Sequence, residues 1–120
     1  MTDQVILYGG KLSLYSARVR SYLRPQRIAF TERAPGSERA LKVIFPKIGR
    51  RIIPVVELPD DTLLQDGARI IDHFEASGQS RFSVYPDDPA LDVVARPFDL
   101  FGNDGLWRPA MHYRWNLPEQ

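Results

Sequence analysis

The order of short apolar runs and helical periodicities constrains this chain more than any other feature of its sequence. Residues 5–8 form a β-prone run that Gly9-Gly10 stops, and residues 28–31 form a second such run. Between the two runs, apolar residues recur at the spacing of one helical face: Tyr15, Val19, Tyr22 and Leu23. Pro25 ends this helix, because proline disfavours a helical conformation in the residue before it. A helix between two strands predicts a parallel pair joined by a right-handed crossover.

The next stretch predicts a second helix, a β-hairpin and a third helix. The second helix lies near residues 38–45, with Ser37 as a candidate N-cap. Residues 52–58 and 62–65 are β-prone runs on either side of the turn Pro59-Asp60-Asp61. A further helical face follows, made of Gly67, Ile70, Ile71 and Phe74. We therefore predict an α/β fold in the order strand, helix, strand, helix, strand, strand, helix, with helices on both faces of a mixed four-stranded sheet.

Residues 81–120 predict a linker followed by a helical segment, with no further strand. Residues 81–89 are rich in proline and aspartate and predict a linker. An amphipathic helix follows, with an apolar face made of Leu91, Val94, Ala95, Phe98 and Phe101. Pro97 inside this pattern would kink or shorten the helix. We expect a first domain over residues 1–80, the linker over 81–89, and the start of a helical segment over 90–120.

Composition and charge exclude several classes of function. The chain has no cysteine, which removes disulfides, thiolate metal sites and CxxC redox chemistry and is compatible with a cytoplasmic protein. No apolar stretch approaches the roughly 20 residues of a membrane-spanning helix. The segment from Lys11 to Arg51 carries eleven Lys or Arg against two Glu, which favours either an anionic ligand or a solvated basic surface. No nucleic-acid recognition motif accompanies it. His73 and His112 have no second ligand at metal spacing, so we expect no metal site.

Several polar residues have structural roles that the local sequence favours. Ser13 or Ser16 is placed to cap the first helix, and Asp66 is placed to cap the third. Pro54 begins a strand, where an X–Pro bond is trans in most proteins and cis in about 5–6% of cases. Tyr8 lies in an apolar strand, where a packing role is the more common one.

Two segments resemble the glutathione-binding domain of glutathione transferases. Residues 8–20 read Tyr-Gly-Gly-Lys-Leu-Ser-Leu-Tyr-Ser-Ala-Arg-Val-Arg, which is similar to the family's tyrosine-glycine loop, serine and Val-Arg helix. Residues 53–56, Ile-Pro-Val-Val, with the hairpin and residues 64–75, resemble the family's Val-Pro-Val strand, turn and acidic-Ser helix. The resemblance covers residues 4–78, and residues 107–115 look like the start of the second domain. It implies a thioredoxin-like fold (βαβ-α-ββα) followed by a partial helical C-terminal domain.

The resemblance also implies a glutathione site. It implies a cis bond between Ile53 and Pro54, with the Ile53 backbone pairing with the cysteinyl part of glutathione like an added strand. Asp66 matches the acidic position that meets the γ-glutamyl ammonium. Ser13 matches the position that stabilises the thiolate, with Tyr15 and Ser16 as alternates. The family has a serine at the position of Gly67, whose hydroxyl binds the γ-glutamyl carboxylate. We expect about tenfold weaker binding without it.

The resemblance implies the partners as well. Ile52 stands where a glutamine or lysine is common, so Arg51 or Arg50 could meet the glycyl carboxylate instead. The family implies glutathione as co-substrate, a small electrophilic substrate and a homodimer, with no nucleic-acid or membrane partner. In the family the electrophile lies against the second domain, most of which this sequence lacks. We therefore expect partly preserved glutathione recognition and weak or missing transferase activity. The alternative is a non-catalytic thioredoxin-fold module that binds partners.

Overall fold

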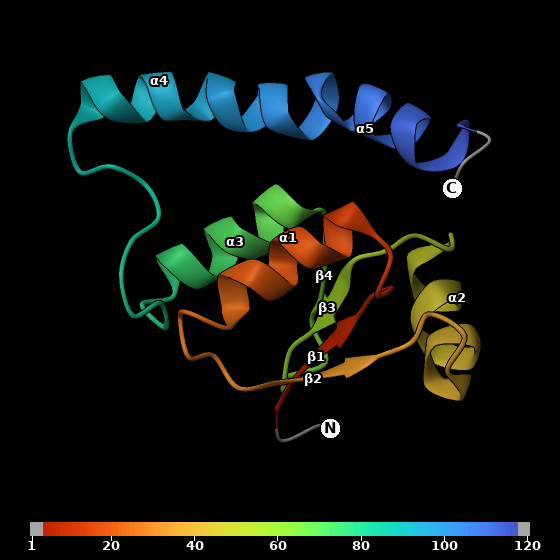
Figure 1. Cartoon of the computed structure of the whole chain (residues 1–120). Coiled ribbons are helices and arrows are strands. Elements are labelled where there is room, and N and C mark those ends of the chain that lie inside the picture. The colour runs from red at the N-terminus through yellow and green to blue at the C-terminus, as the bar shows by residue number, and fades with distance from the viewer. Residues whose placement is uncertain (1–3, 118–120) are drawn as a thin grey trace. The chain divides into compact units, whose positions relative to one another are not determined.

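The computed structural model of the chain describes residues 4–117 and contains two compact units, Met1–Phe82 and Ser83–Gln120 (Figure 1). The first unit contains β1 (Val5–Tyr8), α1 (Leu14–Leu23), β2 (Phe30–Arg33), the π-helix η1 (Ala40–Ile44), α2 (Phe45–Ile48), β3 (Val55–Glu57), β4 (Leu63–Gln65) and α3 (Gly67–Ala76). The second unit contains α4 (Pro89–Leu100), the π-helix η2 (Phe101–Gly105) and α5 (Trp107–Trp115).

The four strands form one mixed sheet in the order β2-β1-β3-β4. β1 pairs in parallel with β2 through the α1 crossover, and β3 pairs antiparallel with both β1 and β4. α1 and α3 lie along one face of the sheet, and η1 and α2 cover the other (Figure 1). The predicted α/β fold, a mixed four-stranded sheet with flanking helices, is confirmed.

Alternation of side chains along the strands builds a core on each face of the sheet. On one face, strand residues pack against η1 and α2 in a cluster of Ile6, Tyr8, Ala40, Ile44, Phe45 and Val55. Leu7 and Val56 point the other way, because successive strand residues alternate between the two faces. On that side α1 and α3 bury Val19, Leu23, Ile70 and Phe74. Both faces of β1 are buried, which explains why its sequence is an uninterrupted apolar run.

The strand register brings three chain segments to one edge of the sheet. Tyr8 pairs with Val55, and Val55 pairs with Gln65. β3 runs antiparallel to both of its neighbours, so the residues just after β1, just before β3 and just after β4 meet at this edge. Those residues are Gly9 and Gly10, Ile53 and Pro54, and Asp66 and Gly67. Most of the site residues predicted from the sequence belong to these three segments.

Several element boundaries differ from those predicted, and two of the differences have a clear cause. β2 begins at Phe30 instead of residue 28, because the Ile28 N–H still donates to the Leu23 carbonyl at 3.2 Å and Arg27 has a φ of 58°. The second helix continues past residue 45 to Ile48. Pro46 is tolerated because it lies in the first turn of α2, where backbone N–H groups have no acceptor within the helix.

The second unit is a run of three helical elements. Asp88 caps α4 by accepting a hydrogen bond from the Ala90 N–H at 2.8 Å. Pro97 does not end α4, which continues to Leu100 and passes into η2. Such π-helical turns occur where the regular ladder of an α-helix is interrupted. Within the described part of this unit, none of α4, η2 and α5 has a buried residue.

Candidate functional site

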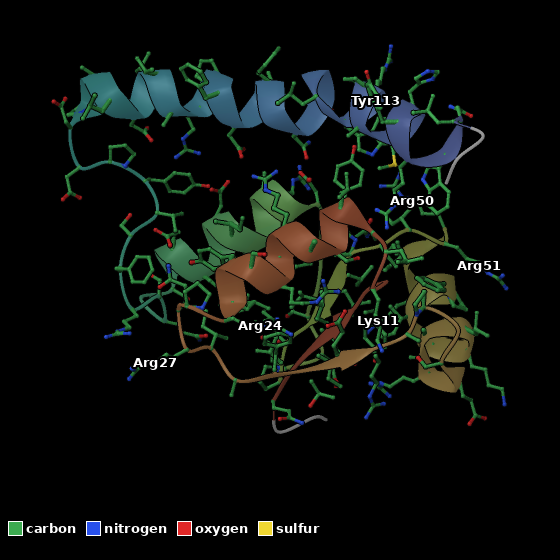
Figure 2. All side chains as sticks on the ribbon, viewed as in Figure 1. Lys11, Arg24, Arg27, Arg50, Arg51 and Tyr113 are labelled. Atoms are coloured by element: carbon green, nitrogen blue, oxygen red, sulfur yellow. The ribbon has the colours of Figure 1, made fainter. Side chains whose placement is uncertain are left out.

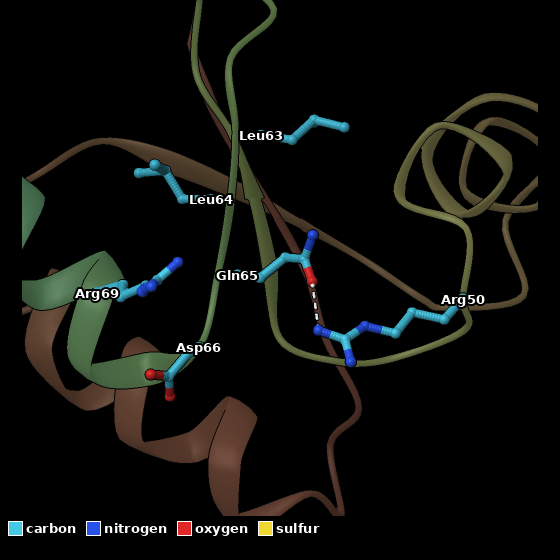
Figure 3. Close-up of a pocket in the computed structure, with 6 residues that line it drawn as sticks. All are labelled: Arg50, Leu63, Leu64, Gln65, Asp66 and Arg69. Carbon is cyan, nitrogen blue, oxygen red and sulfur yellow. Dashed lines mark hydrogen bonds between the residues drawn. The ribbon is translucent and has the colours of Figure 1, made fainter.

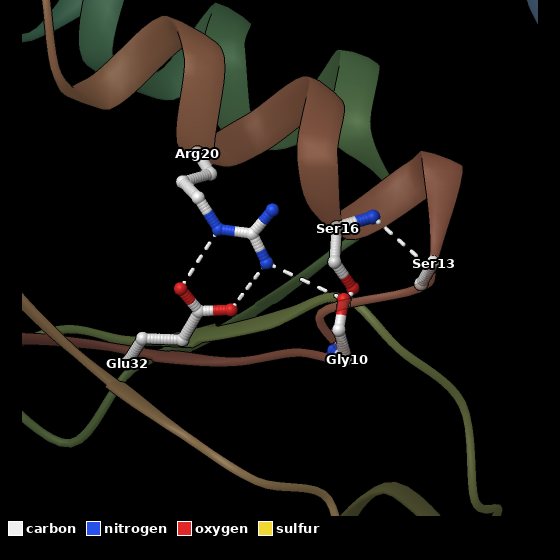
Figure 4. A network of polar contacts seen from close by, with 5 residues as sticks. All are labelled: Gly10, Ser13, Ser16, Arg20 and Glu32. Carbon is white, nitrogen blue, oxygen red and sulfur yellow. Dashed lines mark hydrogen bonds and ion pairs between the residues drawn. The ribbon is translucent and has the colours of Figure 1, made fainter.

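The loop after β1 is held in place by contacts from α1. Ser16 is fully buried, and its Oγ accepts a hydrogen bond from the Gly10 N–H at 3.1 Å. Arg20 donates from Nε to Oε2 of Glu32 at 2.8 Å, and its Nη2 donates both to Oε1 of Glu32 and to the Gly10 carbonyl, the latter at 3.3 Å (Figure 4). The hydrogen bonds between these two side chains raise the pKa of Arg20 and lower the pKa of Glu32. Gly10 is therefore fixed at both its N–H and its carbonyl.

Ser13 is the N-cap of α1. Its Oγ accepts a hydrogen bond from the Ser16 N–H at 3.2 Å (Figure 4), so Ser13 and not Ser16 is the cap. The residue is half-buried, and a hydroxyl that accepts one bond can still donate its proton to another group. Ser16 cannot act as such a donor to a ligand, because it is buried against Gly10.

Ser13 and Ile53 lie close to the same glycine. A Cβ atom on Gly10 would be 3.3 Å from Ile53 Cδ1 and 3.6 Å from Ser13 Cβ. The peptide bond between Ile53 and Pro54 is cis, Pro54 is buried and Ile53 is half-buried. The ladders of β3 begin only at Val55, so the Ile53 backbone stands outside them. The structure thus brings Ser13, Ile53 and Pro54 together beside the Gly10 loop.

Asp66 has an unusual backbone conformation directly before α3. Its φ is 69° and its ψ is 128°, in a region that costs a non-glycine residue about 1–3 kcal/mol. Asp66 occupies the N-cap position, but its side chain makes no capping hydrogen bond. The capping role that the sequence favours is therefore not observed, and the residue is exposed.

A cavity of about 540 Å³ opens beside Asp66 (Figure 3). Its lining consists of Arg50, Leu63, Leu64, Gln65, Asp66 and Arg69. Arg50 extends across it and donates from Nη2 to Oε1 of Gln65 at 3.4 Å. The volume lies within the usual range for small-molecule sites, about 300–1,000 Å³. One carboxylate and two guanidinium groups in the lining suit a ligand that carries both signs of charge.

The two arginines named from the sequence differ in their relation to this cavity. Arg50 lines it, whereas Arg51 does not; both line a smaller depression of about 280 Å³ against α2. Arg69 is a cavity residue that the sequence reasoning missed. Its place one helical turn after Asp66 is a signal that could have found it, because residues three apart share a helix face.

The other cations labelled in Figure 2 spread over the first unit. Lys11 extends from the loop after β1, Arg24 and Arg27 from the end of α1, and Arg51 from the loop after α2 (Figure 2). All four residues are exposed and belong to separate segments of the chain. Of the two interpretations of the basic excess, a solvated surface describes these four, and Arg50 is the cation from this segment that reaches the cavity.

Arg18 of α1 occupies the space beside Gly67. Gly67 is the first residue of α3 and is buried. A Cβ atom on it would lie 3.3 Å from Arg18 Cδ, 3.7 Å from Nε and 3.8 Å from Nη1. Arg18 therefore lies where a side chain at residue 67 would begin, next to Asp66. No local sequence signal predicts this contact, because it depends on the packing of α1 against α3.

Tyr8 is unavailable as a ligand-binding hydroxyl. It is fully buried and donates to Oε2 of Glu57 at 2.7 Å, and Arg39 Nε donates to the same oxygen at 3.1 Å. Burial, together with the hydrogen bond to Glu57, raises the pKa of Tyr8 to about 12. Tyr8 is thus a structural residue, as its sequence context indicates.

Between residues 4 and 117, no helix has the length and apolar character needed to cross a membrane. Over that range, the His, Asp and Glu side chains form no group of three or more that could hold a metal ion. The His73 ring packs edge-on against Phe74, and the His112 ring against Tyr113.

Sequence comparison connects these features to one family. The profile of the N-terminal domain of glutathione S-transferases matches residues 7–80. That range includes the Gly10 loop, the Ile53–Pro54 bond and the cavity beside Asp66. No curated protein sequence matches the chain at a significant level.

Solved glutathione S-transferases share the fold. The Tau class protein of mango, Mangifera indica, is 22% identical, has a TM-score of 0.72, and aligns over 91% of this chain and 49% of its own. A protein of Rhodospirillum rubrum is 19% identical, with a TM-score of 0.72 and coverages of 87% and 47%. A homologue from Sulfitobacter, solved with bound glutathione, is 18% identical, with a TM-score of 0.66 and coverages of 86% and 50%. The chain spans about half the length of these proteins. The predicted thioredoxin-like fold is confirmed.

Proposed function

The chain belongs to the glutathione S-transferase family, whose N-terminal domain profile matches residues 7–80, and from this membership we propose that it binds glutathione and activates the glutathione thiol for attack on a small electrophile. The observation that carries the proposal is Asp66. It is exposed at a cavity of about 540 Å³, has a positive φ and does not cap α3. Residues in disfavoured backbone conformations cluster at ligand sites. We assign the γ-glutamyl ammonium of glutathione to this carboxylate.

The other contacts follow from the same edge of the sheet. The Ile53 backbone stands outside the ladders of β3, which supports pairing with the cysteinyl part of glutathione, and Pro54 holds that segment. The Gly67 N–H at the start of α3 is a donor for an anionic group. Arg50 extends across the cavity and is the better placed partner for the glycyl carboxylate, with Arg51 next to it in the chain.

Ser13 is the residue to which we assign thiol activation. Only the thiolate is a good nucleophile, and a thiol resembling free cysteine has a pKa of about 8.5. A hydroxyl donor at the positive end of a helix lowers that pKa. Ser13 caps α1 with its lone pair and retains its proton for the sulfur. The thiolate then forms a carbon–sulfur bond with the electrophile, the leaving group departs with its electron pair, and the thiol proton passes to solvent.

A second candidate function is a non-catalytic module that binds partners. Two observations favour it: Gly67 supplies no hydroxyl to the site, and Ser13 already has a capping role. In either case we propose a homodimer, and the cysteine-free sequence supports a cytoplasmic location.

Calorimetric titration of glutathione into the chain tests the binding step. Asp66→Asn removes the charge while keeping a residue type that tolerates positive φ. We expect it to weaken glutathione binding about tenfold to hundredfold, the range for one hydrogen bond to a charged group. Asp72→Asn, which removes an exposed carboxylate further along the same helix, is the matched control and should bind like the wild type. Absence of binding in the wild type at millimolar glutathione would contradict the proposal.

Conjugation of glutathione to a chloro-nitrobenzene separates the two candidate functions. We expect Ser13→Ala to slow conjugation about tenfold to hundredfold at unchanged glutathione affinity. The pKa of the bound thiol, followed by thiolate absorbance as pH varies, should rise towards its free value. Ser13→Thr keeps both the cap and the hydroxyl and should retain activity. Glutathione binding without turnover in the wild type would favour the module.

A further inference from the structure

Ser13, to which the proposed function assigns thiol activation, belongs to a closed set of hydrogen bonds. Its N–H donates to the Gly10 carbonyl at 3.1 Å. The Gly10 N–H donates to Oγ of Ser16 at 3.1 Å, and the Ser16 N–H donates to Oγ of Ser13 at 3.2 Å (Figure 4). The position of the Ser13 hydroxyl therefore depends on where Gly10 lies.

An ion pair from outside the loop holds the Gly10 carbonyl. This carbonyl accepts a second hydrogen bond, from Nη2 of Arg20 at 3.3 Å. Nη2 also donates to Oε1 of Glu32, and Nε of Arg20 donates to Oε2 of the same carboxylate at 2.8 Å. A bidentate contact of this kind fixes the plane of the guanidinium group, so Glu32 determines where the remaining N–H of Nη2 points. In Figure 4 the guanidinium lies between Glu32 and Gly10.

The ion pair lies in a partly buried place, where water competes with it less than at an exposed site. The side chains of Arg20 and Glu32 are 15% and 25% exposed. On the premise of the proposed function, we propose that Arg20 and Glu32 are positioning residues for thiol activation. Glu32 orients Arg20, and Arg20 fixes the Gly10 carbonyl and with it the Ser13 hydroxyl that faces the sulfur of glutathione.

Two readouts follow Ser13 with and without ligand. Hydrogen exchange of the Ser13 N–H, measured by NMR on the ligand-free chain, reports its bond to the Gly10 carbonyl. The pKa of the bound glutathione thiol, followed by thiolate absorbance as pH varies, reports activation. Arg20→Met keeps an aliphatic stem and removes the donor. We expect it to speed the exchange about twofold to tenfold, the range for one neutral hydrogen bond, and to raise the thiol pKa towards its free value of about 8.5.

A probe without a thiol separates positioning from a general loss of structure. S-methylglutathione has no thiol proton to release, so its affinity for Arg20→Met should equal its affinity for the wild type. Glu32→Gln keeps an oxygen that accepts from Arg20 but loses the charge, and should change both readouts in the same direction by less. The double variant should match Arg20→Met alone, because Glu32 acts through Arg20. Glu38→Gln breaks the exposed ion pair with Lys42 and should change neither readout.

The outcomes are distinguishable. Unchanged Ser13 exchange in Arg20→Met overturns the route through Gly10, and faster exchange with an unchanged thiol pKa overturns the role in activation. Additive effects in the double variant, or a loss of affinity for S-methylglutathione, also overturn the proposal. Failure of the wild type to bind glutathione overturns the proposed function, and this role with it, whatever the exchange shows. If Arg20→Met does not fold, as judged by circular dichroism, Glu32→Gln must change both readouts for the proposal to stand.

Discussion

Glu57 is an acidic residue buried in the first unit, with 2% of its surface exposed. Burial opposes its ionisation, but hydrogen bonds from Arg39 and Tyr8 outweigh burial and hold the pKa of Glu57 below its ordinary value. Arg39 donates to it through two nitrogens, and this contact raises the pKa of Arg39 in turn. The three side chains join η1 to β1 and β3, so this network ties a helical segment to the centre of the sheet.

The stability of the first unit should therefore depend on the charge of Glu57. A carboxyl group with a lowered pKa in the folded state stabilises above its unfolded pKa, about 4.3, and loses that contribution as pH falls through its folded pKa. We expect Glu57→Gln to lower the free energy of unfolding at neutral pH. The difference from wild type should shrink in acid, as urea titrations at a series of pH values would measure. A difference that stays constant with pH would contradict this account.

Removing the partner of Glu57 should cost more than removing a surface ion pair. Arg39→Met leaves a buried carboxylate without its cation, for which we expect a loss of about 3–5 kcal/mol. Lys42→Met, three residues further along, breaks the exposed pair with Glu38, whose side chains are 72% and 78% exposed. That change should stay within about 0.5 kcal/mol. Equal losses for the two variants in urea unfolding would show that the Glu57 network is not a buried pair in solution.

At the scale of elements, the join between β1 and α1 determines where the site residues stand. A Cβ atom on Gly9 would lie 3.0 Å from both Cβ and Oγ of Ser16. Ser16 cannot move aside easily, because it is fully buried and its Oγ holds the Gly10 N–H. The loop therefore has to move, and with it Ser13 and the side of the site that it shares with Ile53.

Gly9→Ala should accordingly affect both stability and binding. We expect a loss of about 1–3 kcal/mol in unfolding free energy, the usual cost of overpacking, together with weaker glutathione binding by calorimetry. Gly36→Ala is the matched control, because a Cβ atom there would meet nothing within 4 Å, and it should stay within about 0.5 kcal/mol. Weaker stability with unchanged glutathione affinity would mean that the loop does not position the site.

The local sequence predicts some of the helices and strands correctly and others only in part. β1 and the hairpin are β-prone runs, and α1 and α3 have apolar residues at helical spacing. The existence and order of these elements were therefore predictable from the sequence pattern. The start of β2 was not, because Ile28 is still bonded to the end of α1. The hydroxyl of Ser37, a predicted cap, has no hydrogen-bond partner among the residues that the structure describes.

Some features of the candidate site were likewise predictable from the sequence, and others were not. The sequence predicted a group of residues next to α1, β3 and α3, and the register of the sheet explains why those segments meet. The positive φ of Asp66 and the contact between Arg18 and Gly67 were not predictable. The contact depends on how α1 and α3, which are distant in sequence, pack together, and no local pattern records it.

At the scale of the whole molecule, the second unit exposes apolar side chains that its own helices do not cover. Exposed positions in it include Val93 at 70%, Phe98 at 72% and Phe101 at 58%. Single exposed apolar residues are ordinary, but an amphipathic helix with no residue buried by its own unit has a whole apolar face that a further surface can cover. Covering such a face stabilises an assembly by roughly 25 cal/mol for each Å² of apolar area that is removed from water. This gain favours association between copies of the chain.

We therefore expect the chain to self-associate, and sedimentation velocity over a series of concentrations measures this directly. Phe98→Asp places a charge on the uncovered face and should shift the equilibrium towards monomer, since burying an unpaired carboxylate costs several kcal/mol. Leu12→Asp introduces the same charge at a residue of the first unit that is 66% exposed, and should leave association unchanged. Raising the salt concentration should preserve the association, because apolar contacts are not screened while surface ion pairs are. A wild type that sediments as a monomer at every concentration would show that the apolar residues of α4 are not a contact surface, and a loss of association in salt would assign the contact to charges instead.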